Sequence, residues 1–397
     1  MAKLPPPARV TASSDTPPVL AQARPEAGRD LGASGRARSR ELLSRSALLL
    51  GSLSVAFVAS EAAFGVLPAT EGSVLNVYNR TNTAGLDCYP TNPRGYFDLD
   101  LREPATRARF ESLRVRRVED CAAHAPHAVE LRYNSLQFRD REPGTKRPGT
   151  RRVAVLGDSF TEGQGVKEED AYPRGLERAL NAVGGRWEVL NFCRRGADFP
   201  ELDDTFEEVL ELDPDVVVYG MGLNDCEPSD DFRARHSFVT EMLEGPRQKP
   251  ALLDGPPPFG ARTALFVQGR LERYHVDRAM RAWYAELYGE RNREGWARTR
   301  GYIERMHRAM RLRGGHFLVA TWPVLAHLDG DYPFGQIHDA VGRFCHAAGI
   351  AWLDLLPALR GRPAEELWVH ALDAHPNEVA HRLAAESLAP AVRRLTD

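Results

Sequence analysis

The sequence has no excess of basic residues, which nucleic-acid-binding proteins need in order to neutralise phosphates. Its 397 residues include 52 Lys or Arg and 55 Asp or Glu, for a formal net charge of -3. The five cysteines and twelve histidines form no spaced cluster typical of a zinc site. These absences argue against a nucleic-acid partner and against a bound metal ion.

The sequence also lacks a complete nucleotide-binding loop. The run Gly163-Gln164-Gly165 has no third glycine where a dinucleotide loop requires one. No Lys-Ser or Lys-Thr pair follows it, as would be needed in a phosphate-binding loop. We therefore expect no nucleotide cofactor.

Long apolar runs are rare, and the one that is present lies near the N-terminus. Residues 46–67 read SALLLGSLSVAFVASEAAFGVL, in which Glu61 is the only charged residue. This length is enough to cross a hydrocarbon layer, which needs about 20 residues. Residues 1–45 are rich in Pro, Ala, Gly and Ser and carry eight basic residues against four acids, so we expect a disordered tail. The positive-inside rule places this tail in the cytoplasm and the chain after Leu67 outside.

Three interpretations of residues 46–67 stay open: an uncleaved membrane anchor, a signal peptide cleaved after Ser60, or a buried core helix. Glu61 argues against a position deep in lipid. It lies near the outer end of the segment, however, where the cost of a carboxylate falls. The anchor and the signal peptide both predict that the remaining chain is periplasmic or extracellular.

Beyond residue 67 the chain has two parts of different character. Residues 68–150 are rich in turn-forming residues and predict an irregular extension with a few short strands. Residues 151–397 alternate strand and helix patterns, which predicts an α/β domain: a three-layer sandwich with a mainly parallel sheet. The expected strands lie in RRVAVLGDS, RWEVLNFCRRG, PDVVVYGMGLND, HFLVATWPVL and IAWLDLLPAL. A helical insertion at about 226–315 is either a solvated hairpin that packs its aromatic side chains on the domain or a cap over a substrate cleft.

In the stretch RRVAVLGDSFTEGQGV a run of β-formers stops at Gly157, and Asp158 and Ser159 follow. Asp and Ser are common helix N-caps, so the pair has a purely structural explanation. In an open parallel sheet, however, reactive groups gather beyond the carboxyl ends of the strands. The sequence places four further candidates at such ends or after the last strand: Gly196, Asn224, Asp373 and His375.

These residue types together have the roles that acyl transfer requires. Ser159 Oγ is a weak nucleophile unless an imidazole takes its proton, which is the role we expect of His375. Asp373 is then expected to orient that ring and to stabilise the imidazolium. The oxyanion of a tetrahedral intermediate needs preorganised donors. The backbone N–H groups of Ser159 and Gly196 and the side-chain amide of Asn224 are the candidates for that oxyanion hole.

The chain resembles the SGNH/GDSL-type serine hydrolases over residues 150–397. Four blocks occur in the family's order: Gly157-Asp158-Ser159-Phe160, Asn191 to Gly196, Gly222-Leu223-Asn224-Asp225, and Asp373-Ala374-His375-Pro376-Asn377. The resemblance implies a flavodoxin-like sheet, a Ser/His/Asp catalytic triad, no metal or other cofactor, and hydrolysis or transfer of ester-linked acyl groups. Together with residues 46–67 it implies a membrane-anchored, bacterial-type member of the family.

One departure from the family's pattern concerns the acid of the triad. The commonest His block has Asp three residues before His, where this chain has Leu372, and Asp373 is two residues before His375. In an extended segment residues i and i+2 project to the same side, so Asp373 can still face the site. Asp354 is the alternative acid. His381 lies at helical spacing and is expected to be a surface or packing residue.

The leading hypothesis is a membrane-anchored esterase, outside the cytoplasm, that removes O-acyl groups, acetyl among them, from an envelope or extracellular glycan. The ester chemistry follows from the four blocks, whereas the polysaccharide follows from location and family alone. Two alternatives stay open. One is an O-acyltransferase that passes the acyl group to a sugar hydroxyl, and the other is a non-catalytic carbohydrate-binding module on the same fold.

Export makes the cysteines candidates for disulfides. Cys193 and Cys226 follow what we expect to be adjacent strands, about 5 Å apart, which predicts a bridge between two loops of the site. Two buried free thiols are the alternative. Cys88 and Cys121 are expected to pair in the extension, which leaves Cys345 unpaired.

Overall fold

The computed structural model describes residues 31–66, 97–100, 128–197, 199–244, 259–370 and 373–396. Contacts divide the chain into two units, Met1–Ser60 and Glu61–Asp397. Most of helix α1 (Leu31–Val66) belongs to the first unit, and the sheet and all other helices belong to the second.

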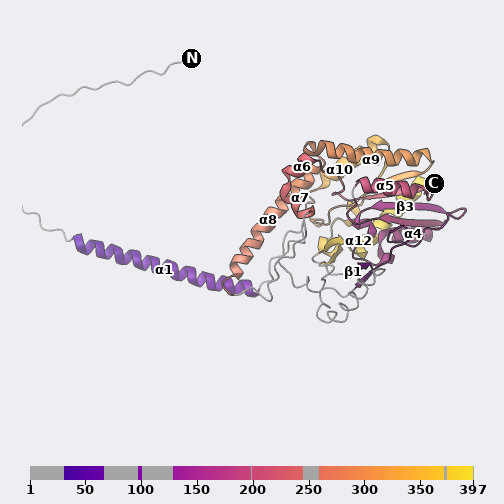
Figure 1. Ribbon diagram of the computed structural model, residues 1–397. Coiled ribbons are helices and arrows are strands. Elements are labelled where there is room, and N and C mark those ends of the chain that lie inside the picture. Colours follow the sequence, from indigo (N-terminus) through magenta and orange to yellow (C-terminus); the bar gives the residue numbers. More distant parts are fainter. Residues whose placement is uncertain are drawn as a thin grey trace, which may run out of the picture. The chain divides into compact units, whose positions relative to one another are not determined.

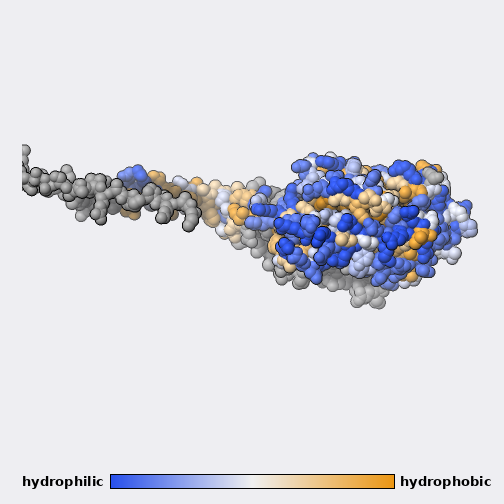
Figure 2. All heavy atoms as spheres, turned by 90° about the horizontal axis from the view of Figure 1, so that it is seen from above, coloured by the Kyte–Doolittle hydropathy of each residue, from blue (hydrophilic) through white to orange (hydrophobic). Residues whose placement is uncertain are grey.

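Helix α1 begins at Leu31, so residues 31–45 are helical, where the sequence predicts disorder. Within α1, Arg40–Phe64 is long and apolar enough to cross a membrane. Its large apolar side chains are exposed. By contrast, hydrophilic residues predominate on the face of the second unit that Figure 2 shows. A core helix would bury these side chains, whereas an anchor and a signal sequence would both leave them uncovered.

The second unit is built on a five-stranded parallel sheet in the order β4-β3-β5-β6-β7. The strands are β3 (Arg151–Gly157), β4 (Trp187–Cys193), β5 (Val216–Met221), β6 (His316–Thr321) and β7 (Ala351–Asp354). Each lies in a segment that the sequence predicts as a strand, because near-continuous apolar runs suit strands covered on both faces. The predicted α/β fold class, with a parallel sheet between helices, is confirmed.

Helices cover both faces of this sheet (Figure 1). On one face lie α4 (Tyr172–Ala182) and α12 (Glu378–Thr396), which pack against each other. On the other lie α5 (Phe199–Leu210), α9 (Arg293–Leu312) and α10 (Gly335–Ala348). Each turns its apolar stripe inward, as α4 does with Leu176 and Leu180, and these stripes form one core with the strands.

The insertion between β5 and β6 consists of α6 (Asp230–Arg235), α7 (Ser237–Glu244), α8 (Arg262–Leu287) and α9 in the described residues. The C-terminal half of α8 buries Val276, Met280, Trp283 and Tyr284 in the main core, and Tyr288, directly after the helix, is buried there as well. Aromatic side chains of the insertion therefore pack on the domain, as one of the two sequence interpretations expects.

The remaining strands and helices of the described residues are short. Strand β1 (Phe97–Asp100) pairs in parallel with β2 (Ala128–Leu131), and β8 (Trp368–His370) pairs antiparallel with β9 (Asp373–Pro376). The short helices are α3 (Ser159–Glu162) and α11 (Leu356–Leu359), with 3-10 turns at Glu168–Asp170, Glu290–Asn292 and Ala364–Leu367.

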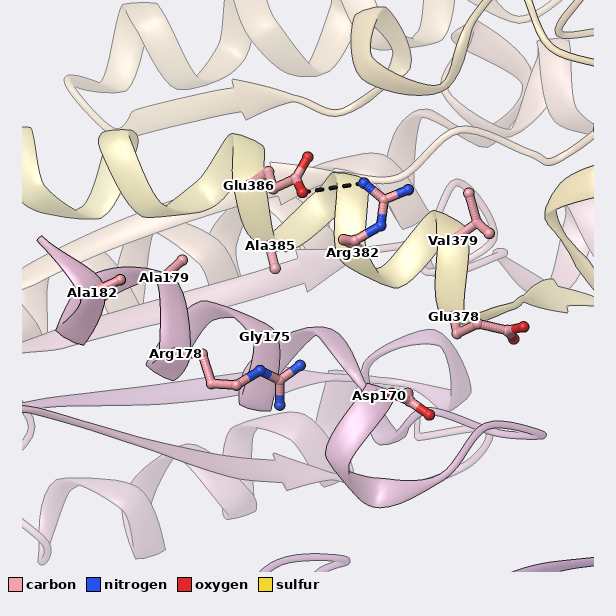
Figure 3. Close-up of a pocket in the computed structure, with 10 residues that line it drawn as sticks. All are labelled: Asp170, Gly175, Arg178, Ala179, Ala182, Glu378, Val379, Arg382, Ala385 and Glu386. Carbon is pink, nitrogen blue, oxygen red and sulfur yellow. Dashed lines mark hydrogen bonds and ion pairs between the residues drawn. The ribbon is translucent and has the colours of Figure 1, made fainter.

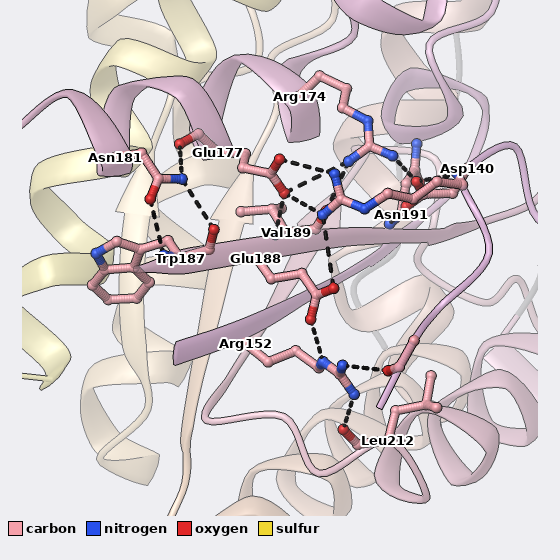
Figure 4. Close-up of polar contacts among 12 residues, drawn as sticks. Asp140, Arg152, Arg174, Glu177, Asn181, Trp187, Glu188, Val189, Asn191 and Leu212 are labelled. Atoms are coloured by element: carbon pink, nitrogen blue, oxygen red, sulfur yellow. Dashed lines mark hydrogen bonds and ion pairs between the residues drawn. The ribbon is translucent and has the colours of Figure 1, made fainter. Parts of the chain in front are cut away.

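Buried ion pairs fasten the end of the irregular extension and the start of β3 to the rest of the domain (Figure 4). Asp140 accepts a hydrogen bond from Asn191 N at 2.6 Å and pairs with Arg174 of α4. The buried Arg152 pairs with Glu188 of β4 at 2.7 Å. Removing one partner of such a pair would leave an uncompensated buried charge, which costs about 3–5 kcal/mol.

The predicted Cys193–Cys226 disulfide is wrong, because both residues are buried free cysteines. Strand β3 lies between β4 and β5, so the two cysteines follow strands that are two spacings apart, about 10 Å, beyond disulfide reach. Each thiol contacts a main-chain carbonyl instead. Cys345 is free, as predicted, and Cys88 and Cys121 lie outside the described residues.

Candidate active site

Ser159 is the first residue of α3, two residues beyond the last residue of β3. The Asp158 carboxylate caps this helix by accepting a hydrogen bond from Phe160 N at 2.9 Å. Gly157 is required by close packing, because a Cβ there would lie 2.8 Å from the carbonyl oxygen of Gly220 on β5 and would also collide with Thr161. The Gly-Asp-Ser sequence therefore makes a tight strand-to-helix turn with the serine at its exit.

His375 comes to Ser159 from a position 216 residues later in the chain. It lies on β9, and its Nε2 is 2.9 Å from Ser159 Oγ. Its ring packs edge-on against Phe160, with ring centroids 5.5 Å apart. The structure thus brings two of the sequence-predicted residues together in a geometry that lets an imidazole take a hydroxyl proton.

A buried aromatic cluster packs against Phe160, the residue whose ring contacts His375. Trp322, which follows β6 and is fully buried, contacts the rings of Phe160, Tyr172 and His381 at centroid distances of 5.7, 5.5 and 6.0 Å. Tyr172 N donates to His381 Nδ1 at 3.2 Å. His381 is therefore a packing residue, one of the two roles that the sequence predicts for it, and close packing of this kind limits movement of the Phe160 ring.

Burial, together with the positive charge of Arg139, lowers the pKa of His381 from 6.5 to about 3. Below pH 6.5 the unfolded chain binds a proton at this position that the folded chain excludes, so stability must fall as the pH falls. At 1.36 kcal/mol per unit, the free energy of unfolding should fall by about 3 kcal/mol more between pH 6.5 and 4 in the wild type than in His381→Asn. Denaturant titrations of both proteins across this range measure the difference, and parallel pH curves would contradict it.

The three candidate oxyanion donors follow three neighbouring strands. Gly157 pairs in register with Cys193 on β4 and with Gly220 on β5, so these strands end level with one another. Ser159, Gly196 and Asn224 follow that line by two, three and four residues. Gly196 has φ +69, a left-handed conformation that favours glycine, and both it and Asn224 are exposed.

A carboxyl group fixes the turn that carries Asn224. Asp225 accepts hydrogen bonds from Gly222 N at 2.9 Å and from the Tyr219 hydroxyl at 2.7 Å. Burial raises the pKa of Asp225 well above its usual range, and the nearby charge of Asp158 raises it further. Burial also raises the pKa of Asp158. Asp158 and Asp225, which follow β3 and β5, are therefore two carboxyl groups whose ionised forms are disfavoured by burial.

A buried ion pair, which the sequence analysis missed, connects α3 to the Gly196 turn. Glu162, three residues after Ser159 and almost fully buried, accepts a hydrogen bond from Arg195 Nε at 2.5 Å. The same carboxylate accepts one from the Tyr133 hydroxyl at 3.1 Å. Since Arg195 directly precedes Gly196, this charge-assisted contact limits how far the turn can move relative to Ser159.

Arg139, also missed, holds the loop that follows α3. It is 1% exposed, and its guanidinium donates to the carbonyl oxygens of Gly163 at 2.5 Å and Val166 at 2.6 Å. A single arginine in a turn-rich extension carries no sequence signal of burial, because charged residues are mostly exposed. The run Gly163-Gln164-Gly165, for which the sequence predicts no nucleotide binding, is part of the loop that the Arg139 side chain holds.

The sequence offers two candidates, Asp373 and Asp354, for the acid of the predicted triad. Asp373 lies on β9, and its side chain is outside the part of the chain that the structure describes. Asp354, the alternative, contacts another histidine: its Oδ1 is 2.7 Å from His338 Nδ1 and also accepts from Leu356 N at 2.9 Å. Asp354 therefore belongs to a separate buried contact at the end of β7.

A surface groove lies between α4 and α12 (Figure 3). Ten residues line it: Asp170, Gly175, Arg178, Ala179, Ala182, Glu378, Val379, Arg382, Ala385 and Glu386. None of them is a sequence-predicted site residue, and Arg382 is paired with Glu386 at 3.2 Å. The Ser159–His375 pair is not part of this groove.

The chain thus combines a parallel α/β sheet with a hydrogen-bonded Ser–His pair beyond the strand ends, where reactive groups gather in such sheets. Residues 155–383, more than half of the chain, match the model of the GDSL-like Lipase/Acylhydrolase family. The chain belongs to this family, as the four sequence blocks predict.

Several solved structures are similar to the chain at low sequence identity. TesA is 15% identical, covers 62% of this chain and 99% of its own, and has a TM-score of 0.38. A catalytic mutant of Axe2, an acetylxylan esterase from Geobacillus stearothermophilus, is 16% identical, covers 62% of this chain and 93% of its own, and has a TM-score of 0.35. The psychrotrophic esterase EstA from Pseudoalteromonas sp. is 11% identical, covers 62% of this chain and 97% of its own, and has a TM-score of 0.36. No curated protein matches the chain.

Proposed function

We propose that the protein is a serine esterase that hydrolyses O-acyl esters, acetyl esters among them, on an envelope or extracellular glycan. The observation that carries the proposal is the 2.9 Å contact between His375 Nε2 and Ser159 Oγ at the carboxyl edge of the sheet. Among the described residues, Ser159 is only partly buried and Gly196 and Asn224 are exposed, which supports a bulky alcohol such as a polysaccharide as the substrate.

In the proposed reaction Ser159 Oγ attacks the ester carbonyl carbon while its proton passes to His375 Nε2. The oxyanion of the tetrahedral intermediate accepts hydrogen bonds from Ser159 N, Gly196 N and the Asn224 amide. When the intermediate collapses, the C–O bond to the alcohol breaks and His375 returns the proton to the leaving oxygen. Water, deprotonated by His375, then hydrolyses the acyl-enzyme to a carboxylic acid and free serine. Asp373 is assigned the orientation of the imidazole.

The proposal includes the location and the division of the chain. We assign residues 1–45 to a cytoplasmic tail, 46–67 to an uncleaved anchor, 68–150 to an extension and 151–397 to a hydrolase domain outside the cytoplasm. The exposed apolar side chains of Arg40–Phe64 and the basic residues that precede them support this arrangement. The glycan substrate rests on that location and on the chemistry of the family.

Hydrolysis of small chromogenic esters tests the activity. The full chain in detergent should turn over p-nitrophenyl acetate, and comparison with the butyrate and octanoate esters should define the acyl length that the site accepts. Release of acetate from an O-acetylated polysaccharide should then be lost in Ser159→Ala. A stoichiometric burst of p-nitrophenol without turnover would replace the hydrolase by an acyltransferase that lacks its acceptor. If neither a burst nor turnover is observed, the result would contradict catalysis and favour a binding module.

A further inference from the structure

Among the described residues, the N-terminal half of α8 carries large apolar side chains that are exposed. Phe259 just before the helix, and Val267, Leu271 and Tyr274 within it, are 60%, 48%, 55% and 59% exposed. The last three are spaced i, i+4 and i+7, which places them on one face of the helix. Figure 1 shows this half of α8 extending away from the sheet, whereas its other half packs in the core. We call these four residues the α8 stripe.

The beginning of α8 is held by Glu61, the residue with which the second unit starts. Its carboxylate accepts hydrogen bonds from Gly260 N at 2.7 Å, Thr263 N at 2.8 Å and Arg262 N at 3.1 Å. The first N–H groups of a helix have no partner within the helix, and the helix dipole favours an anion there. Glu61 therefore acts as a cap supplied by a segment about 200 residues earlier.

A second contact fixes the same two segments. The rings of Phe64 and Phe266 stack with centroids 3.9 Å apart. Glu61 and Phe64 both lie in the last turn of the apolar stretch Arg40–Phe64. Whatever depth these two residues occupy, residues 260–266 must occupy nearly the same depth.

This relation locates the beginning of α8 if the apolar stretch spans a membrane. A carboxylate in the centre of a bilayer costs about 2.5–3.5 kcal/mol, and the cost falls toward the interface. Glu61, near the outer end of the stretch and with its oxygens satisfied by N–H groups, fits the boundary between acyl chains and headgroups. The beginning of α8, held at Glu61, would then lie at that boundary. The α8 stripe, which starts there, would lie next to the same boundary.

We propose that the α8 stripe is a second membrane contact, which lies in the outer headgroup boundary of the bilayer that α1 crosses. Amphipathic helices of this kind combine an apolar face with basic residues. Arg270, whose guanidinium stacks over Phe266 at 5.2 Å, supplies a cation for lipid phosphates beside the stripe. The inference rests on the proposed anchor, and it gives the hydrolase domain a membrane attachment in addition to α1.

Fluorescence of a probe on the stripe tests this contact. The full chain, reconstituted in vesicles of phosphatidylcholine and phosphatidylglycerol at 3:1, carries an NBD label in Leu271→Cys. The matched control is Leu312→Cys, another exposed leucine, at the end of α9. The unsubstituted protein labelled in parallel corrects for the native cysteines. We expect emission from position 271 to shift to the blue, to be quenched by lipids brominated in the acyl chain, and to resist aqueous iodide, with the opposite result at position 312.

Each other outcome has a distinct meaning. Equal iodide quenching at both positions, in protein that resists alkaline carbonate extraction, would overturn the stripe and leave the anchor standing. Protection from iodide at position 271 without quenching by brominated lipid would mean that a second copy covers the stripe, and would overturn the lipid contact. Extraction of the full chain by carbonate would overturn the anchor and, with it, this inference. Ester hydrolysis in detergent, measured separately, is unaffected by any of these results.

Discussion

Replacing Ser159 by alanine should lower kcat/KM for ester hydrolysis by about three or more orders of magnitude and leave the fold intact. The hydroxyl is assigned the covalent step, and its loss removes the nucleophile that His375 would activate at 2.9 Å. His375→Ala should cost about as much. Because the two groups would act as one unit, the double variant should be no slower than either single variant.

Two surface substitutions provide matched controls for this series. Ser237, at the start of α7, and His346, on α10, are exposed and are not among the assigned site residues. Ser237→Ala and His346→Ala should keep wild-type rates with p-nitrophenyl acetate. If Ser159→Ala retained most of its activity while still folded, the nucleophile assignment would be lost. If the effects of Ser159→Ala and His375→Ala multiplied in the double variant, the residues would not act as a unit.

The second large effect is expected from Gly157→Ala, a change of one methyl group. The added carbon would lie 2.8 Å from the Gly220 carbonyl oxygen and would collide with Thr161, and the backbone at φ +155 is rarely adopted by other residues. Overpacking and backbone strain of this kind together cost about 3 kcal/mol or more. We expect the midpoint of thermal unfolding to fall by roughly 5–10 °C. Activity should also fall where the variant is still folded, because Ser159 is two residues away.

Gly144→Ala is the control for this substitution. No atom lies within 4 Å of the position where its Cβ would be, so the methyl group has room. Trp fluorescence during heating of both variants, together with kcat/KM at 25 °C, measures the two effects. A Gly157→Ala protein with the unfolding midpoint and rate of Gly144→Ala would show that the turn tolerates a side chain, contrary to the packing described above.

The strands and their contribution to the site could be read from local patterns. The runs VAVL and VVVY, within RRVAVLG and PDVVVYG, are continuous and apolar, which suits strands covered on both faces, and both lie in strands of the structure. The polar residues that follow them mark the edge where groups from separate segments meet. Ser159 and His375 could be paired in advance because the blocks around them match a family, and the structure brings their side chains into contact.

The order of the strands could not be read in the same way. The sequence places β4 and β5 next to each other along the chain, whereas the sheet inserts β3 between them. The predicted Cys193–Cys226 disulfide failed for this reason. Strand order depends on which faces the connecting helices cover, and no single strand's sequence records it.

Buried charges were the other feature that the sequence did not reveal. Arg139 and Glu162 look like ordinary surface residues in the sequence, and the apolar run around Glu61 gives no sign of its partner, because a charge is buried only where partners from distant segments satisfy it. Their partners lie on α3 and its loop, on the Gly196 turn and at the start of α8.

The sequence by itself determined the α/β class, the family, the five strands and the residues at their ends, because periodicity and short motifs are local properties of a chain. Only the tertiary structure decided the strand order, the state of Cys193 and Cys226, and the burial of His381. It also decided the clamp that Arg139 and Glu162 form around the Ser159 turn. These features depend on contacts between segments far apart in sequence, and the free energy of such contacts is set by burial and by partners that exist only in the folded chain.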